Sequence, residues 1–193
     1  MEDEPIVIVS GLPRSGTSLM MQMLAAGGVP IMTDALRVAD ASNPRGYFEL
    51  EAVKKLRADK DWLDGACGHA IKIIHLLLRE LPTDGGFTYR VLFMERTLPE
   101  VLASQRKMLE RAGKPAADDA MLTKVFTAQL AQAKEWMHAH SCFSFLPVEH
   151  RRVLTEPQLV AAEIARFLGR DLNLAAMAAA VDPALYRERQ TLR

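Results

Sequence analysis

Short apolar runs recur along the chain and predict buried strands. The clearest runs cover residues 6–9, 70–74 and 89–96, and weaker candidates cover residues 29–32 and 143–150. Consecutive apolar and β-branched positions, without polar alternation, are typical of strands that are covered on both faces of a parallel sheet. The pattern therefore predicts a parallel sheet.

Segments with helical spacing separate these runs. They cover residues 16–26, 49–63, 75–81, 99–113, 118–138, 155–169 and 174–181. Their ends carry helix signals: Thr155 and Asp118 or Asp119 are cap candidates, and Gly113 and Gly169 are stops. Strands that alternate with helices favour an α/β fold, a three-layer sandwich with a central, mostly parallel sheet.

Composition narrows the class of protein without identifying it. The chain has 193 residues, which suits one domain over residues 1–193. The 24 basic and 24 acidic residues cancel, so the charge predicts no broad attraction to nucleic acid or to an anionic membrane. No apolar stretch approaches a membrane span, and the acidic N-terminus does not resemble a secretory signal. We expect a cytoplasmic protein that binds its ligands locally.

A glycine-containing loop between the first strand and the first helix is typical of phosphate binding. Gly11, four further residues, and then Gly16-Thr17-Ser18 have the spacing of a P-loop. Glycines let backbone N–H groups approach an anion, and the helix start adds its positive end. Thr17 occupies the position of the lysine in nucleotide kinases, so the loop lacks the cation that assists transfer of the γ-phosphate of ATP. The positive charge comes instead from Arg14, inside the loop.

The stretch "GLPRSGTSLM" resembles the 5′-phosphosulfate loop of sulfotransferases. These enzymes use 3′-phosphoadenosine-5′-phosphosulfate (PAPS) and have the P-loop nucleoside triphosphate hydrolase-like fold. The matching positions are Arg14, Ser15, Gly16, Thr17 and Ser18. By this resemblance, all five bind the cofactor, and Arg14 with the loop amides stabilises the leaving 5′-phosphate.

A second stretch, "MERTLPEVLASQRKML", resembles the 3′-phosphate motif of the same family. In that motif an arginine ends a strand and a serine follows eight residues later within the next helix. Arg96 and Ser104 have this spacing. The resemblance implies that they bind the 3′-phosphate of PAPS.

The resemblance also implies an activity and its catalytic residues. It predicts sulfuryl transfer from PAPS to a hydroxyl of a small-molecule, lipid or sugar acceptor, with no metal required. Lys72 would contact the sulfonate. For the catalytic base, His75 is one candidate residue, although it lies one position beyond the Lys-x-His spacing of the cytosolic enzymes, and Asp34 and Glu49 are carboxylate candidates.

Two other functions stay open at this point. One is a P-loop nucleotide kinase with a displaced lysine. The other is a sulfotransferase-like protein that binds the nucleotide without turnover. The sequence predicts neither the acceptor nor the oligomeric state.

Overall fold

Four parallel strands form the central sheet of the computed structural model, which describes residues 4–34, 36, 46–115 and 118–182. They are β1 (Ile6–Gly11), β2 (Ala70–Lys72), β3 (Tyr89–Glu95) and β4 (Phe143–Glu149), in the order β2-β1-β3-β4. The chain leaves β1 for one side of the sheet and returns for β3 on the other side. Strand order therefore reverses between β1 and β3, where parallel sheets bind ligands beyond the carboxyl ends of their strands.

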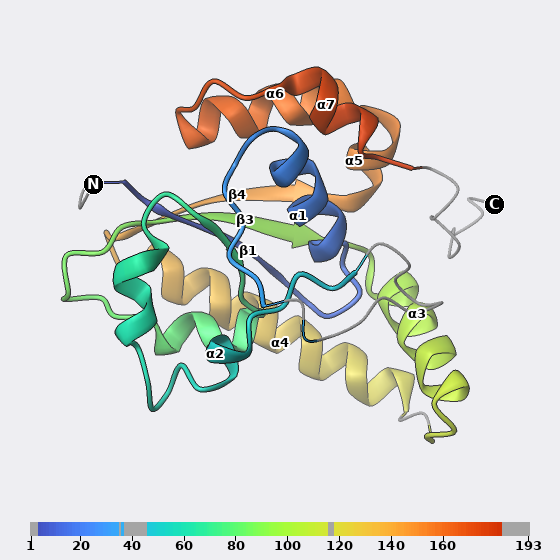
Figure 1. Ribbon diagram of the computed structural model, residues 1–193. Coiled ribbons are helices and arrows are strands. Elements are labelled where there is room, and N and C mark those ends of the chain that lie inside the picture. Colours follow the sequence, from blue (N-terminus) through green and yellow to red (C-terminus); the bar gives the residue numbers. More distant parts are fainter. Residues whose placement is uncertain (1–3, 35, 37–45, 116–117, 183–193) are drawn as a thin grey trace.

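Helices cover both faces of this sheet (Figure 1). One face carries α1 (Thr17–Ala26), α5 (His150–Thr155), α6 (Pro157–Leu168) and α7 (Leu174–Ala179). The other face carries α2 (Glu51–Lys54), α4 (Asp119–His138) and the 3-10 helices η1 (Asp61–Ala66) and η2 (His75–Glu80). Helix α3 (Leu98–Arg111) follows the carboxyl end of β3. The predicted three-layer α/β architecture is confirmed.

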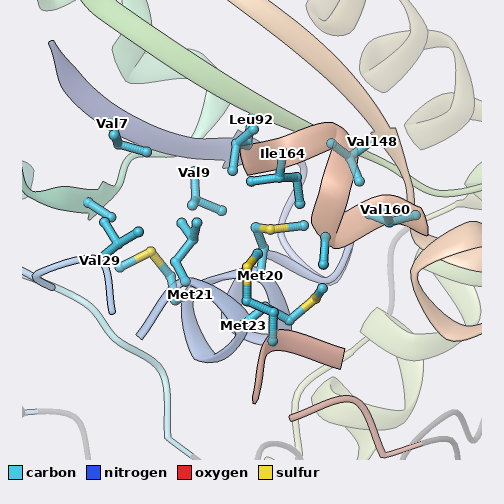
Figure 2. Close-up of a cluster of buried hydrophobic side chains, with 14 of the residues drawn as sticks. Val7, Val9, Met20, Met21, Met23, Val29, Leu92, Val148, Val160 and Ile164 are labelled. Carbon is cyan, nitrogen blue, oxygen red and sulfur yellow. The ribbon is translucent and has the colours of Figure 1, made fainter. Parts of the chain in front are cut away.

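Side chains of β1 alternate between two hydrophobic cores. Val7 and Val9 join the core beneath α1, α6 and α7, where the methionines of α1 are fully buried (Figure 2). Ile6 and Ile8 join the core beneath α4. Because the strand is covered on both faces, every one of its positions is buried, which explains the unbroken apolar run in the sequence.

Three predicted elements differ from the structure. Residues 49–63 do not form one helix: α2 ends at Lys54, and an Asx turn, in which the Asp61 N–H donates to Asp59 Oδ1, precedes η1. Residues 29–32 form a single bridge, from Ile31 to Ala70, and no strand. Thr155 does not cap α6, because it already ends α5 and its hydroxyl donates to the carbonyl of Arg151.

Within the described residues, no helix combines the length and the apolarity that crossing a membrane requires.

Candidate functional site

The phosphate loop connects β1 to α1, and two of its glycines cannot be replaced without strain. Gly11 and Gly16 have φ values of 139° and 103°. A Cβ on Gly11 would lie 2.6 Å from the carbonyl oxygen of Met94, and a Cβ on Gly16 would lie 2.4 Å from Cδ2 of His150. The backbone is therefore packed tightly where it turns into the helix, and only glycine fits both positions.

The hydroxyl-bearing residues of the loop have different surroundings. Ser15 is buried, and its Oγ donates to the carbonyl of Leu12 at 2.7 Å, which closes the turn. Thr17 is the first residue of α1, and its side chain is also buried. Ser18 is less buried, and its Oγ donates to the carbonyl of Tyr47. The first turn of α1 contains no acidic residue, so its positive end stays suited to an anion.

Arg14 joins the two stretches that the sequence singled out as phosphate motifs. Its Nε donates to Ser104 Oγ at 3.0 Å, and its carbonyl oxygen accepts a hydrogen bond from Nη1 of Arg96 at 3.1 Å. Arg96 also pairs with Glu100, with 2.9 Å between Nε and Oε2. The end of β3 and the buried face of α3 therefore hold the phosphate loop from one side.

Lys72, at the end of β2, approaches the loop from the other side. Its Nζ donates to the carbonyl of Tyr47 at 2.9 Å and to Ser18 Oγ at 3.4 Å, and it lies 3.6 Å from Glu49 Oε1. Only 11% of the Lys72 side chain is exposed. Thr17 occupies the position where a P-loop usually has a lysine. In this chain the ammonium of Lys72 approaches the loop from a neighbouring strand instead.

The three candidates for the catalytic base lie in different environments. Glu49 is beside Lys72 and its side chain is 28% exposed. Asp34 accepts hydrogen bonds from the N–H groups of Glu51 and Leu36, and these bonds lower the pKa of its carboxyl group. Asp34 therefore serves the start of α2, a role that needs no reacting proton.

His75 is buried on the α4 side of the sheet. Its Nδ1 lies 3.2 Å from the carbonyl oxygen of Gly11, and its Nε2 lies 3.0 Å from Gln129 Oε1 on α4. Lys72, in contrast, contacts Ser18 on α1, which covers the opposite face. Strand β2 ends at Lys72 and His75 is the first residue of η2, and the two side chains lie on different faces of the sheet.

His150 is a site residue to which the sequence gave no role. It begins α5 directly after β4, is 7% exposed, and packs against Gly16 of the phosphate loop. Burial, together with the charge of Arg96 and against an opposing effect of Glu100, lowers the pKa of His150 to about 4. The signal that could have revealed it is its place at the carboxyl end of the fourth strand.

A pocket of about 230 Å³ opens beside the loop at the point where strand order reverses. It is lined by Leu12, Ser15, Phe93, Met94, Glu95, Arg96, Leu130 and Lys134. Its volume is below the several hundred Å³ of sites that enclose a whole drug-sized ligand, so it suits one group of a larger molecule. Among the described residues, no group of three or more His, Cys, Asp or Glu side chains is arranged to hold a metal ion.

Solved structures of sulfotransferase domains share this fold. The chain superposes on the "Sulfotransferase Domain from the Curacin Biosynthetic Pathway" with a TM-score of 0.58 and 12% identity, over 98% of this chain and 93% of that one. The corresponding values for the sulfotransferase domain of the Synechococcus PCC 7002 olefin synthase are 0.60, 16%, 97% and 88%. For sulfotransferase STF9 of Mycobacterium avium they are 0.53, 14%, 97% and 69%.

At the level of sequence, no protein-family model and no curated protein matches this chain. The structural likeness, at these identities, confirms the fold that the resemblance implied. The roles of individual residues stay predictions.

Proposed function

We propose that this protein is a sulfotransferase that moves a sulfuryl group from PAPS to a hydroxyl of a small-molecule, lipid or sugar acceptor. The observation that carries the proposal is the convergence of three cationic side chains, Arg14, Lys72 and Arg96, on one glycine-containing loop. Arg14 and Arg96 lie on the α3 side of the loop, and Lys72 lies on the β2 side. A donor with phosphate at both its 5′ and its 3′ end matches a site whose cations are spread in this way.

The loop and its cations fit the chemistry of the leaving group. In sulfuryl transfer, the bond between sulfur and the bridging oxygen breaks, and negative charge develops on the 5′-phosphate of the departing bisphosphate. Backbone N–H groups at the start of α1, with Arg14 and Lys72, would stabilise that charge. Fixed cations at this position would neutralise the developing charge, as Mg²⁺ does in a kinase. We therefore propose transfer without a metal.

We assign the 3′-phosphate to Arg96 and Ser104. Both are largely buried, and both contact Arg14 of the phosphate loop. Charge-assisted hydrogen bonds from a guanidinium to phosphate oxygens are stronger than neutral ones. Because Arg96 also holds the Arg14 carbonyl, the site for one end of the donor supports the site for the other end.

We assign the catalytic base to Glu49 in preference to His75 and Asp34. Glu49 is partly exposed and adjoins Lys72, whereas both nitrogens of His75 lie near oxygens in the interior and Asp34 bonds backbone amides. The Glu49 carboxylate would accept the proton of the acceptor hydroxyl while that oxygen forms its new bond to sulfur. The products are a sulfate ester, the bisphosphate and a protonated Glu49, which returns its proton to solvent.

The nucleotide kinase is a weaker alternative, because Thr17 is buried where a kinase needs a mobile lysine. A ligand-binding measurement separates the two functions. We expect adenosine 3′,5′-bisphosphate to raise the melting temperature without Mg²⁺, and AMP, which lacks the 3′-phosphate, to raise it less. A shift with Mg-ATP and none with the bisphosphate would refute the proposal.

Turnover requires a second measurement. Incubation with labelled PAPS and a panel of hydroxyl acceptors, followed by mass detection, should reveal a sulfated product. Tight binding of the bisphosphate with no transfer to any acceptor would instead favour the catalytically silent alternative.

A further inference from the structure

Two residues other than glycine adopt a left-handed backbone conformation in the described part of the chain. Arg14 has a φ of 73° and Phe48 has a φ of 52°. An aromatic side chain at such a φ is an outlier, because its Cβ crowds the following carbonyl oxygen. Such outliers persist where surrounding contacts over-determine the backbone, and they cluster at functional sites. Arg14 belongs to the phosphate loop, and Phe48 lies between two residues that meet Lys72.

Hydrogen bonds fix the backbone on both sides of Phe48. Before it, the carbonyl of Tyr47 accepts from Lys72 Nζ at 2.9 Å and from Ser18 Oγ at 3.4 Å. After it, the carbonyl of Glu49 accepts from Thr33 Oγ1 at 2.8 Å and from the N–H of Asp34 at 3.3 Å.

The Phe48 side chain adds a third constraint, because it is partly buried against the core beneath α1. These contacts together fix the backbone in its left-handed conformation at Phe48.

This backbone conformation accompanies one geometric feature of the site. A single ammonium, that of Lys72, contacts the carbonyl oxygen of Tyr47 and approaches the carboxylate of Glu49. We propose that Phe48 is a positioning residue, whose left-handed conformation aims the Glu49 carboxylate at Lys72 and at the acceptor hydroxyl. This inference rests on the proposed function for its catalytic consequence, but its claim about the backbone can be tested without any activity.

Two substitutions of Phe48 separate conformation from packing. Phe48→Val keeps an apolar side chain, but a β-branched residue strongly disfavours a positive φ. Phe48→Asn loses the apolar contact, but asparagine tolerates this conformation. If packing alone matters, the valine variant is the more stable and the more active of the two. If the left-handed conformation matters, the order reverses, and Phe48→Gly behaves like Phe48→Asn.

The first measurement is the melting temperature of the two variants. We expect the asparagine variant to melt above the valine variant, although valine is the more apolar residue. A valine variant that is as stable as the asparagine variant, or more stable, would overturn the proposal. This measurement tests the claim about the backbone even if the protein transfers no sulfate.

The second measurement is a comparison of kcat with the dissociation constant of adenosine 3′,5′-bisphosphate. Misplacing a reacting group by about 1 Å can cost about 100-fold in rate, so we expect kcat of Phe48→Val to fall at least about tenfold. Bisphosphate affinity should fall by less than kcat does, because the contacts of Arg14, Arg96 and Ser104 are untouched. Phe48→Asn should retain kcat within about threefold.

The two arms also distinguish failure of this inference from failure of the proposed function. If the wild-type protein does not bind the bisphosphate, the proposed function fails while the order of melting temperatures still tests the backbone conformation of Phe48. If the wild-type protein binds and transfers, but kcat falls equally in both variants, Phe48 does not position Glu49.

Discussion

At the scale of single residues, the site depends on where Lys72 is held. A lysine at a strand end commonly extends its ammonium into water, because the charge is costly to bury. Here the side chain is 11% exposed, and a carbonyl, a hydroxyl and a carboxylate surround its Nζ. Such a fixed cation needs no reorganisation when charge develops beside it, which is the condition for strong electrostatic stabilisation.

Glu49→Gln should lower kcat by about 10²–10⁴-fold if the carboxylate is the general base, because glutamine keeps the shape but cannot take the proton. Affinity for adenosine 3′,5′-bisphosphate should stay nearly unchanged. His75→Gln is the contrasting variant: it removes contacts to Gly11 and Gln129, so we expect a lower melting temperature and a smaller loss of kcat. Steady-state kinetics and thermal melts test both, and a larger kcat loss in His75→Gln would return the role of base to the histidine.

Gly16→Ala should abolish bisphosphate binding and destabilise the fold. The new Cβ would lie 2.4 Å from Cδ2 of His150, at a φ of 103° that costs a side chain roughly 1–2 kcal/mol or more. Pairing it with His150→Ala removes the clash but leaves the conformational cost. The double variant should therefore lose less stability than the sum of the losses in the two single variants, as measured by urea denaturation. Strict additivity would mean that His150 does not press on the loop.

At the scale of elements, patterns of apolar residues predicted strands better than they predicted helices around the site. The strand at residues 89–96 was expected and β3 occupies Tyr89–Glu95, because β-branched and aromatic residues fill a doubly covered strand. The apolar stripe in residues 49–63 has spacings of three, which also fit turns and 3-10 helix. The Asx turn at Asp59 and the anchoring of Glu49 by Thr33 override the local preference for one long helix.

The start of α2 gives a test that separates a structural carboxylate from a catalytic one. Asp34 accepts from the N–H of Glu51, so it holds the start of α2, which follows Glu49 in the chain. Asp34→Asn keeps an oxygen acceptor for that amide but cannot act as a base, whereas Asp34→Ala removes the acceptor. We expect Asp34→Asn to retain most of the activity and Asp34→Ala to lose more. Equal and severe losses in both variants would identify Asp34 as the base.

At the scale of the whole molecule, the site is assembled from segments that are distant in sequence. Arg14 meets Ser104 across 90 positions, and Lys72 meets Ser18 across 54. Glycine spacing predicted the first phosphate motif and the resemblance implied the second, and each could be recognised separately because each motif is local. Neither could predict that Arg96 holds the carbonyl of Arg14, since that contact depends on the order of the strands.

His150 is the residue at this junction that links the site to overall stability. Its pKa in the folded protein is about 4, compared with an ordinary value of 6.5. As pH falls below 6.5, the unfolded chain takes up a proton that the folded protein refuses. The contribution of neutral His150 to stability is therefore fully present above pH 6.5 and is lost as pH falls through about 4. A shift of this size corresponds to roughly 3 kcal/mol in the free energy of unfolding.

His150→Gln should remove this pH dependence. We expect the difference in unfolding free energy between wild type and variant, measured by urea denaturation, to fall by up to roughly 3 kcal/mol between pH 7 and pH 4. His138→Gln, at the exposed end of α4, is the matched control. Its unfolding free energy should fall between pH 7 and pH 4 as that of the wild type does. If unfolding free energy depends on pH in the same way in wild type and His150→Gln, the histidine takes up a proton as readily in the folded protein as in the unfolded chain. The imidazole would then be accessible to water beside the phosphate loop and Arg96, and His150 would pack less tightly against Gly16 than the structure indicates.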